Sequence, residues 1–236
     1  MRTGFINEGI TRVRRLLIAV LAVAAALSGM TTAAPARAGA PATPVIFIHG
    51  RNADAGVWGS AQAAFRTGGY PADRMFAWDY DTARSTNEVV AGQLSAYVDQ
   101  VLRQTGAGRV DIVAHSLGGL SARWVAKFGG GNRISHLVTL ASPNHGTEVA
   151  WLCATWDQGC RDMTPGSYVI TKLNSGVETP GPTAYTALWS SCDEQVVPHH
   201  SAQLAGATNI ETGCLKHNDL LTDPAVIARV LATVTG

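Results

Sequence analysis

The sequence predicts an α/β fold with a mainly parallel central sheet, formed by one compact domain over residues 39–236. Three observations predict this class. Strand-like apolar runs alternate with helix-like patterns, which is the order found in proteins with parallel sheets. The serine of AHSLGG (114–119) lies between a strand-like run and a helix-like run. The 198 residues that follow position 38 are also enough to bury one sizeable core.

Residues 1–38 are predicted to be a signal peptide that is removed from the mature protein. Four arginines between positions 2 and 15 precede the apolar run LLIAVLAVAAAL (16–27), and Ala36-Arg37-Ala38 fits a cleavage site. A run of 12 apolar residues is short for a membrane span, although a retained anchor is the alternative interpretation. We therefore expect the protein to be secreted.

The mature chain is close to neutral. Removing residues 1–38 takes away five of the 18 basic and one of the 17 acidic residues, which leaves 13 basic and 16 acidic residues and a net charge of −3. No basic tract remains in the mature sequence, so its charge argues against a nucleic-acid partner.

Hydrophobic periodicity gives the order of the elements. Strands are predicted over 44–49, 74–80, 109–115, 134–142, 183–191 and 207–211. Helices are predicted over 57–65 and 85–104, from Leu117 onward, and over 224–234, where Pro224 suits a first turn. Ser85 and Glu88 have the spacing of a capping box at the start of the second helix.

Residues 143–182 interrupt this rhythm and are interpreted as an insertion of irregular structure. The segment is rich in proline and glycine, and it carries the first two cysteines of the chain. A short helix is predicted near residues 167–174. The regular pattern resumes at residue 183.

The even number of cysteines predicts two disulfides in an exported chain. Four cysteines allow three pairings. We favour Cys153–Cys160 and Cys192–Cys214, because these two bridges close segments that do not cross. No pair has the CxxC spacing of many metal sites, so no metal site is predicted.

Ser116 is the candidate nucleophile. A serine hydroxyl becomes an effective nucleophile when a base lies within hydrogen-bond reach and a carboxylate orients that base. The turn from strand to helix around Ser116 is the setting of a nucleophile elbow, and Gly118 and Gly119 leave the space that such a turn needs. Ala114 stands at the first glycine of the usual G-x-S-x-G pattern, which is a modest departure.

Asp193 and His217 are the candidate partners of this serine. In an α/β-hydrolase the carboxylate and then the histidine follow the serine along the chain, each on a loop after a later strand. Asp193 follows the predicted strand 183–191, and His217 follows the predicted strand 207–211. A bridge from Cys192 to Cys214 would tie these two loops together and orient the base against the carboxylate.

Other side chains compete for both roles. The competing residues are Asp157, Asp162, Glu194 and Asp219 for the carboxylate, and His199 and His200 for the base. Order and loop position favour Asp193 and His217. Asp219 is too near His217 in sequence to orient it and is interpreted as a cap of the following turn. The two competing histidines follow Pro198 in a polar loop and are expected to be solvated.

An oxyanion hole is expected beside the serine. Its first donor in this fold is the backbone N–H after the nucleophile, here that of Leu117. The second donor comes from the loop after the first strand, where FIHGR (47–51) leads us to assign the N–H of Arg51.

Five motifs together resemble the small secreted bacterial lipases of the class 2 (lipase 2) family. They are VIFIHG (45–50), VDIVAHSLGG (110–119), VTLASPNHGT (138–147), SSCDEQVVP (190–198) and KHNDLL (216–221). The A-x-S-x-G form of the elbow is characteristic of that group. The resemblance covers most of the mature chain and implies an α/β-hydrolase core that hydrolyses carboxylic esters, including acylglycerols. It also implies Ser116 as nucleophile, Asp193 as acid and His217 as base, with Arg51 and Leu117 at the oxyanion hole.

Two features depart from the family pattern. Arg51 stands where an apolar residue is common, and a cation near the cleft would alter substrate preference. The insertion 143–182 is longer than a minimal lipase needs, so it is expected to shape the acyl pocket. No carboxylate cluster in the sequence supports the structural calcium that some larger secreted lipases bind.

The leading hypothesis is therefore a secreted triacylglycerol lipase that needs no cofactor. Its expected partner is a lipid or ester substrate at a lipid–water interface, and a monomer without a protein partner is expected. The same chemistry on other substrates is the first alternative, as a short-chain carboxylesterase, phospholipase or polyester depolymerase. A catalytically inactive binding protein on a hydrolase fold is an alternative of another class, and acyl transfer to an acceptor other than water is a third.

Overall fold

The computed structural model describes residues 42–236. The predicted signal peptide and its cleavage site lie outside this range. Within the described part of the chain, no helix combines the length and the apolar character that a bilayer crossing requires.

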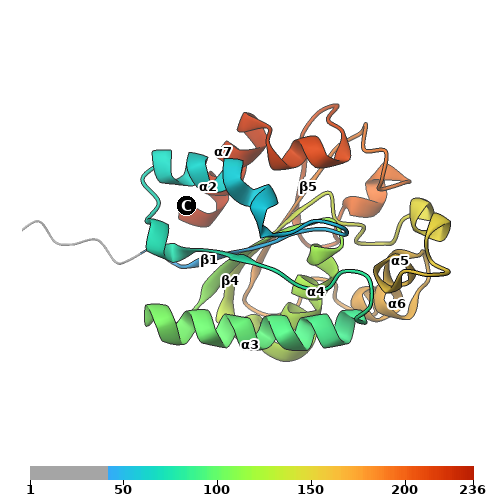
Figure 1. Ribbon diagram of the computed structural model, residues 1–236, viewed down its shortest axis with the longest axis horizontal. Helices are drawn as coiled ribbons and strands as arrows, with labels where there is room; N and C mark the ends of the chain where they lie inside the picture. Colours follow the sequence, from blue (N-terminus) through green and yellow to red (C-terminus); the bar gives the residue numbers. More distant parts are fainter. Residues whose placement is uncertain (1–41) are drawn as a thin grey trace, which may run out of the picture. The chain divides into compact units, whose positions relative to one another are not determined.

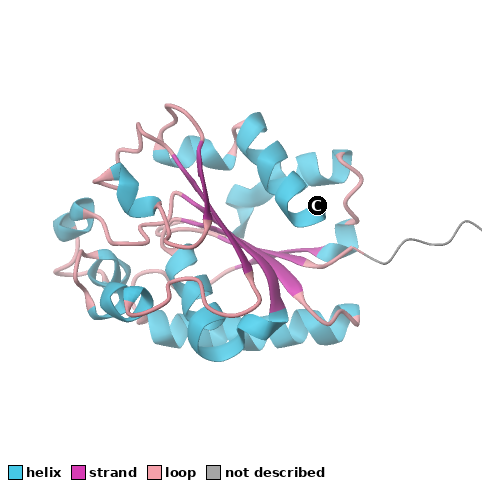
Figure 2. Ribbon diagram, turned by 180° about the vertical axis from the view of Figure 1, so that it is seen from behind, coloured by secondary structure: helices cyan, strands magenta, loops and turns pink. Residues whose placement is uncertain are grey.

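A six-stranded sheet forms the centre of the domain, and all five pairings between its neighbouring strands are parallel. The spatial order is β2-β1-β3-β4-β5-β6, and Figure 2 shows the strands fanned by their twist. The strands are β1 (Val45–Ile48), β2 (Met75–Trp78), β3 (Val110–His115), β4 (Ile134–Leu140), β5 (Ala184–Trp189) and β6 (Thr208–Glu211). Each lies inside one of the predicted strand segments, so the predicted fold class is confirmed.

Helices cover both faces of the sheet. Figure 1 shows α2 (Gly59–Thr67) and α7 (Pro224–Thr235) on one face, and α3 (Asn87–Thr105) and α4 (Gly118–Val125) on the other. The strands supply side chains to both layers, because successive residues of a strand point to opposite faces. In β1, for example, alternate residues belong to separate core clusters, one beneath each pair of helices. Burying each of these large apolar side chains contributes about 1.5–3 kcal/mol.

The start of α3 differs from the prediction. The helix begins at Asn87 after Thr86, and Thr86 makes no side-chain capping bond, so the predicted Ser85–Glu88 capping box is wrong. The N–H of Asn87 instead donates to Oδ2 of Asp162 at 2.8 Å. The insertion therefore supplies an acceptor for the first turn of the helix from 75 residues away in sequence.

The insertion 143–182 is more regular than predicted. It contains the 3-10 helix η5 (Glu148–Leu152) and the short helices α5 (Gln158–Met163) and α6 (Tyr168–Asn174). The predicted helix near 167–174 is α6, whereas α5 was not predicted. The signal for α5 was Asp157, whose side chain accepts a hydrogen bond from the N–H of Cys160 and caps the helix.

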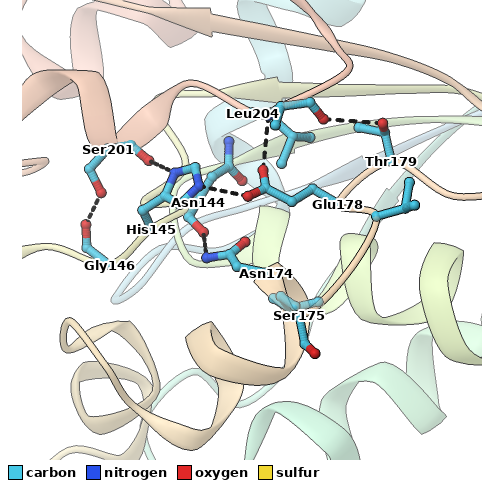
Figure 3. Close-up of polar contacts among 12 residues, drawn as sticks. Asn144, His145, Gly146, Asn174, Ser175, Glu178, Thr179, Ser201 and Leu204 are labelled. Carbon is cyan, nitrogen blue, oxygen red and sulfur yellow. Dashed lines mark hydrogen bonds and ion pairs between the residues drawn. The ribbon is translucent and has the colours of Figure 1, made fainter.

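Polar contacts attach the ends of the insertion to the segment that follows β5. Figure 3 shows His145 between Ser201 and Glu178. The Nε2 atom of His145 lies 3.0 Å from Oε1 of Glu178, and its Nδ1 atom lies 3.3 Å from the carbonyl oxygen of Ser201. The other oxygen of Glu178 accepts from the N–H of Ala205 at 2.9 Å. The insertion is thus attached near both of its ends to the segment between β5 and β6.

Candidate active site

Ser116 occupies the sharp turn between β3 and α4. Its φ angle is +53°, in the left-handed region that non-glycine residues rarely adopt. The turn is held because the N–H of Ser116 donates to the carbonyl of Leu140 at 2.9 Å. The helix starts so close to β1 that a Cβ atom at Gly118 would lie 2.5 Å from the carbonyl oxygen of His49. The nucleophile-elbow geometry that the sequence predicts is therefore present, with Ala114 fully buried in the strand before it.

Asp193 and His217 lie side by side on neighbouring loops. The Nδ1 atom of His217 is 2.9 Å from Oδ2 and 3.0 Å from Oδ1 of Asp193, and both residues are 2% exposed. Asp193 follows β5 and His217 follows β6, and the parallel pairing of these strands brings both loops to one edge. Because Nδ1 faces the carboxylate, Nε2 is the nitrogen left to act as a base.

The environment of Asp193 favours its charged form. Burial acts to raise the pKa of Asp193, but the hydrogen bond and charge of His217 and the backbone N–H groups of Val196 and Gln195 outweigh it. The pKa of Asp193 therefore lies below its usual value. An ionised carboxylate here can stabilise an imidazolium on His217.

The competing carboxylates make other contacts. Oε2 of Glu194 accepts from the backbone N–H of His217 at 3.1 Å, so it contacts the main chain of that residue. Asp219 accepts from the N–H of Lys216 at 3.4 Å, in keeping with the predicted cap. Asp157 pairs with Arg51, and Asp162 accepts the N–H at the start of α3. The competing histidines, His199 and His200, lie on a 3-10 helix and do not line the pocket described below.

Both favoured disulfides are formed. Cys192 is bonded to Cys214, which links the loop of Asp193 to the loop of His217. Cys153 is bonded to Cys160 and closes a short loop within the insertion. No free cysteine is present in the described part of the chain.

A cavity of about 540 Å³ opens beside Ser116 and His217. The lining residues that belong to the insertion are largely apolar, and several of the other lining residues carry polar side chains. The lining includes Arg51, Asn52, Asp54, Asn218 and Thr222 on the polar side, and Val149, Ala150, Met163 and the Cys153–Cys160 pair on the insertion side. The Ser116 hydroxyl makes no hydrogen bond with another described residue. A substrate carbonyl entering this cavity would therefore meet a serine hydroxyl and an imidazole in one cavity.

The predicted oxyanion donors flank the serine. Leu117 follows it at the start of α4, and Arg51 lies in the turn after β1 and lines the cavity. Among the described residues, neither backbone N–H donates to a protein acceptor, so both remain available for a developing oxyanion.

His115 is a buried histidine that contacts the proposed base. It is 3% exposed and lines the cavity beside the serine, and its ring centroid lies 4.6 Å from that of His217. Its Nε2 atom is 3.2 Å from the carbonyl oxygen of His217 and can donate to it as a neutral imidazole. Burial, and then the proximity of His217, lower the pKa of His115 to about 3. His115 therefore stays neutral and supports the backbone of the proposed base without repelling its imidazolium form.

Replacing His115 by glutamine is expected to flatten the acid side of the stability profile. Because the folded-state pKa of His115 lies below the usual histidine value of about 6.5, the unfolded chain takes up this proton first as pH falls. The wild-type protein then loses stability from pH 6.5 towards pH 3, by up to about 1.4 kcal/mol per pH unit. Urea unfolding at pH 7 and pH 5 measures the difference, and we expect the wild type to lose about 2 kcal/mol more than the variant. Equal losses in the two proteins would contradict this assignment.

The described residues offer no group of three or more His, Cys, Asp and Glu side chains arranged to hold a metal ion. The residues described above are a serine and an imidazole in one cavity, a carboxylate beside the imidazole, and the two predicted backbone donors. These are the groups that acyl transfer requires.

A parallel sheet with a serine elbow after β3, a carboxylate after β5 and a histidine after β6 defines the α/β-hydrolase class. Solved structures agree on the fold. The mature form of a Bacillus licheniformis lipase superposes with a TM-score of 0.71 at 17% identity, over 85% of this chain and 96% of that one. Lipase B of Aspergillus fumigatus gives a TM-score of 0.70 at 17% identity, over 83% of this chain and 52% of that one.

Sequence comparison then gives the family. The chain belongs to the family Lipase (class 2). The sequence pattern of that family matches residues 42–227. A triacylglycerol lipase of Pseudomonas fragi is 38% identical over 69 residues, which are 29% of this chain and 23% of the relative. One from Pseudarthrobacter phenanthrenivorans is 43% identical over 58 residues, 25% of this chain and 18% of the relative. The chain thus matches less than a quarter of the length of these curated relatives.

Proposed function

We propose that this protein is a secreted serine ester hydrolase, and specifically a triacylglycerol lipase. The observation that carries the proposal is the site geometry. Ser116 stands on a strained elbow in the same cavity as His217, whose Nδ1 atom is 2.9 Å from a buried carboxylate oxygen of Asp193. Membership of the lipase family and the names of its curated relatives support ester hydrolysis as the activity.

The proposed reaction proceeds through an acyl-enzyme. Nε2 of His217 takes the proton of Ser116 as Oγ attacks the ester carbonyl carbon, and Asp193 stabilises the imidazolium that results. The N–H groups of Leu117 and Arg51 donate to the oxyanion. His217 then protonates the departing alcohol. Water, deprotonated by the same imidazole, cleaves the acyl-enzyme and releases the fatty acid and the free serine.

Secretion is supported by two independent features. The first 38 residues have the pattern of a signal peptide. All four cysteines are paired, as is usual for proteins that fold in an oxidising compartment.

The surface next to the cavity supports a lipid substrate over a small soluble ester. Trp151, Leu152 and Trp156 are 60%, 75% and 71% exposed, and they adjoin the cavity-lining residues Ala150 and Cys153. Large apolar side chains gathered in this way on a soluble surface typically mark an interaction site. Tryptophan in particular favours the boundary between water and lipid. These three residues, here named the apolar rim, would hold the cavity against a lipid surface.

Hydrolysis of a soluble ester and of an emulsion tests the proposal and the role of the apolar rim together. The wild type is expected to hydrolyse p-nitrophenyl butyrate and emulsified long-chain triglyceride. The triple variant with serine at Trp151, Leu152 and Trp156 is expected to lose at least about tenfold on the emulsion and to keep its rate on the soluble ester. The reason is that three apolar side chains transferred from water into lipid are worth several kcal/mol.

Two outcomes would change the assignment. Wild-type activity confined to acetyl and butyryl esters would make the protein a carboxylesterase. An equal loss on both substrates would show that the apolar rim does not act at an interface. The matched control is Phe128→Ser with Val177→Ser, and it should leave both rates unchanged. These residues are also exposed, but they are not adjacent to cavity-lining residues.

A further inference from the structure

One short loop contacts the segments that carry both oxyanion donors. This loop, residues 153–160, is closed by the Cys153–Cys160 disulfide and is here named the disulfide loop. Its Asp157 accepts a hydrogen bond at Oδ2 from Nε of Arg51, at 2.8 Å. The Asp157 side chain is 5% exposed and that of Arg51 is 28% exposed. The pair thus joins residues 106 positions apart in a partly buried setting.

The carboxylate is itself fixed in the disulfide loop. The second oxygen of Asp157, Oδ1, accepts from the N–H of Cys160 at 2.9 Å. Cys160 is fully buried and bonded to Cys153, so the acceptor for Arg51 has little freedom to move. A fixed acceptor holds its donor in turn, because a charged hydrogen bond is stronger than a neutral one.

The same loop packs against the second donor residue. Gly159 approaches Leu117 so closely that a Cβ atom at position 159 would lie 2.7 Å from Cδ2 of Leu117. Its neighbour Gln158 donates its N–H to the carbonyl of Ala83 at 2.7 Å. The loop therefore contacts Leu117 directly and is hydrogen-bonded to the segment that follows β2.

That segment in turn holds the turn of Arg51. The N–H of Asn52 donates to Oγ1 of Thr82 at 3.1 Å, and Asn52 has a φ angle of +56°. The backbone of Arg51 is thus fixed on its C-terminal side by Asn52, while β1 holds its N-terminal side. The peptide that carries the Arg51 N–H is also held through its carbonyl oxygen, which lies 2.8 Å from Nδ1 of His49. The side-chain contact with Asp157 adds a restraint on Arg51 that comes from the disulfide loop.

We propose that the Arg51–Asp157 ion pair is a positioning device for the oxyanion hole. The ion pair would hold the N–H of Arg51 at the distance where the oxyanion forms, while Gly159 supports Leu117. Oxyanion donors act within about 2.7–3.1 Å of the developing charge, and a displacement of about 1 Å costs on the order of 100-fold in rate. This inference rests on the proposed serine-hydrolase function. It also assigns a role to the side chain of Arg51, the residue that departs from the family pattern.

Four variants test the device: Arg51→Met, Asp157→Asn, the double variant and Arg51→Lys. Asp157→Asn keeps an oxygen for the N–H of Cys160 but removes the charge that faces Arg51. We expect each of the first two to lower kcat on p-nitrophenyl butyrate by about tenfold to 100-fold with KM within twofold, as displacement of one donor predicts. The double variant should be no slower than either single variant, and Arg51→Lys should recover part of the rate.

A boronic acid gives a second readout. Butylboronic acid forms a tetrahedral anion on a reactive serine, and that anion requires the oxyanion donors. Its inhibition constant should therefore rise by the same factor as kcat falls. The matched control is Asp99→Asn, which breaks the ion pair with Arg133 on the far side of the fold and should change neither value.

The outcomes separate this inference from the proposed function. Unchanged kcat and boronate affinity in Arg51→Met and Asp157→Asn would overturn the inference and leave a serine-dependent activity intact. A fall in kcat without a change in boronate affinity would also overturn it, because the ion pair would then act on another step. A wild-type protein without serine-dependent esterase activity would instead refute the function on which it rests. Arg51→Met keeps the test open if Asp157→Asn does not fold, since the Arg51 side chain is partly exposed.

Discussion

The Ser116→Ala variant is expected to lose on the order of 10⁶-fold in kcat on p-nitrophenyl butyrate, which is the scale of loss when a catalytic serine is removed. The reason is structural. Ser116 is the hydroxyl that stands on the elbow in the cavity with the imidazole of His217. The Ser116 hydroxyl forms no hydrogen bond with another described residue, so its removal should leave the folded state intact.

A glycine variant separates the effect of losing the hydroxyl on activity from the effect of backbone strain on stability. Ser116→Gly should be as inactive as Ser116→Ala, yet more stable than it by about 1 kcal/mol, because glycine adopts a φ of +53° without a Cβ clash. Kinetics and urea unfolding of both variants supply the measurements. Esterase activity that survives in a clean Ser116→Ala preparation would refute the nucleophile assignment. Equal stability of the two variants would argue that the elbow is unstrained.

Replacing Asp193 by asparagine is expected to lower kcat by about 10⁴-fold, because the asparagine would neither select the right His217 tautomer nor stabilise its cation. The neighbouring Glu194 supplies a matched control. Its carboxylate accepts from the backbone N–H of His217, whereas Asp193 contacts the imidazole ring. Glu194→Gln keeps an acceptor for that N–H and should cost no more than about tenfold.

The ratio of the two effects decides which carboxylate orients the base. Steady-state kinetics on p-nitrophenyl butyrate, with circular dichroism as a check on folding, measure both. A larger loss in Glu194→Gln than in Asp193→Asn would reverse the assignment. Similar small losses in both would remove the carboxylate from the proposed mechanism.

The parts of the site that were predictable from sequence share one property. Each sits directly after a strand of a parallel sheet, so its position in space follows from its position along the chain. Ser116, Asp193 and His217 come after β3, β5 and β6, whose carboxyl ends lie at one edge. Local periodicity locates the strands, and the fixed direction of the sheet then brings the three loops together.

Contacts made by the insertion were not predictable in the same way. The Arg51–Asp157 pair and the Asp162–Asn87 hydrogen bond join residues 106 and 75 positions apart. Both acceptors lie in a segment whose path is set by a disulfide and by tertiary packing, not by a repeating pattern. The same limitation explains the wrong capping box at Ser85. The local pattern predicted that Ser85 and Glu88 would cap the helix. The N–H at the helix start instead donates to the carboxylate of Asp162, which only folding brings near.

The Cys192–Cys214 bond has a consequence for how this edge of the fold can open. β6 is the outermost strand, mostly exposed, and pairs with β5 alone. Strands of this kind open locally more readily than central ones, and amide hydrogens on them exchange sooner. The bond encloses all of β6 and ends three residues before His217. When β6 separates from the sheet, the loop of His217 therefore stays tethered to the loop of Asp193. A weakly held edge strand can then precede the loop of the proposed base, because the covalent bond limits how far each local opening extends.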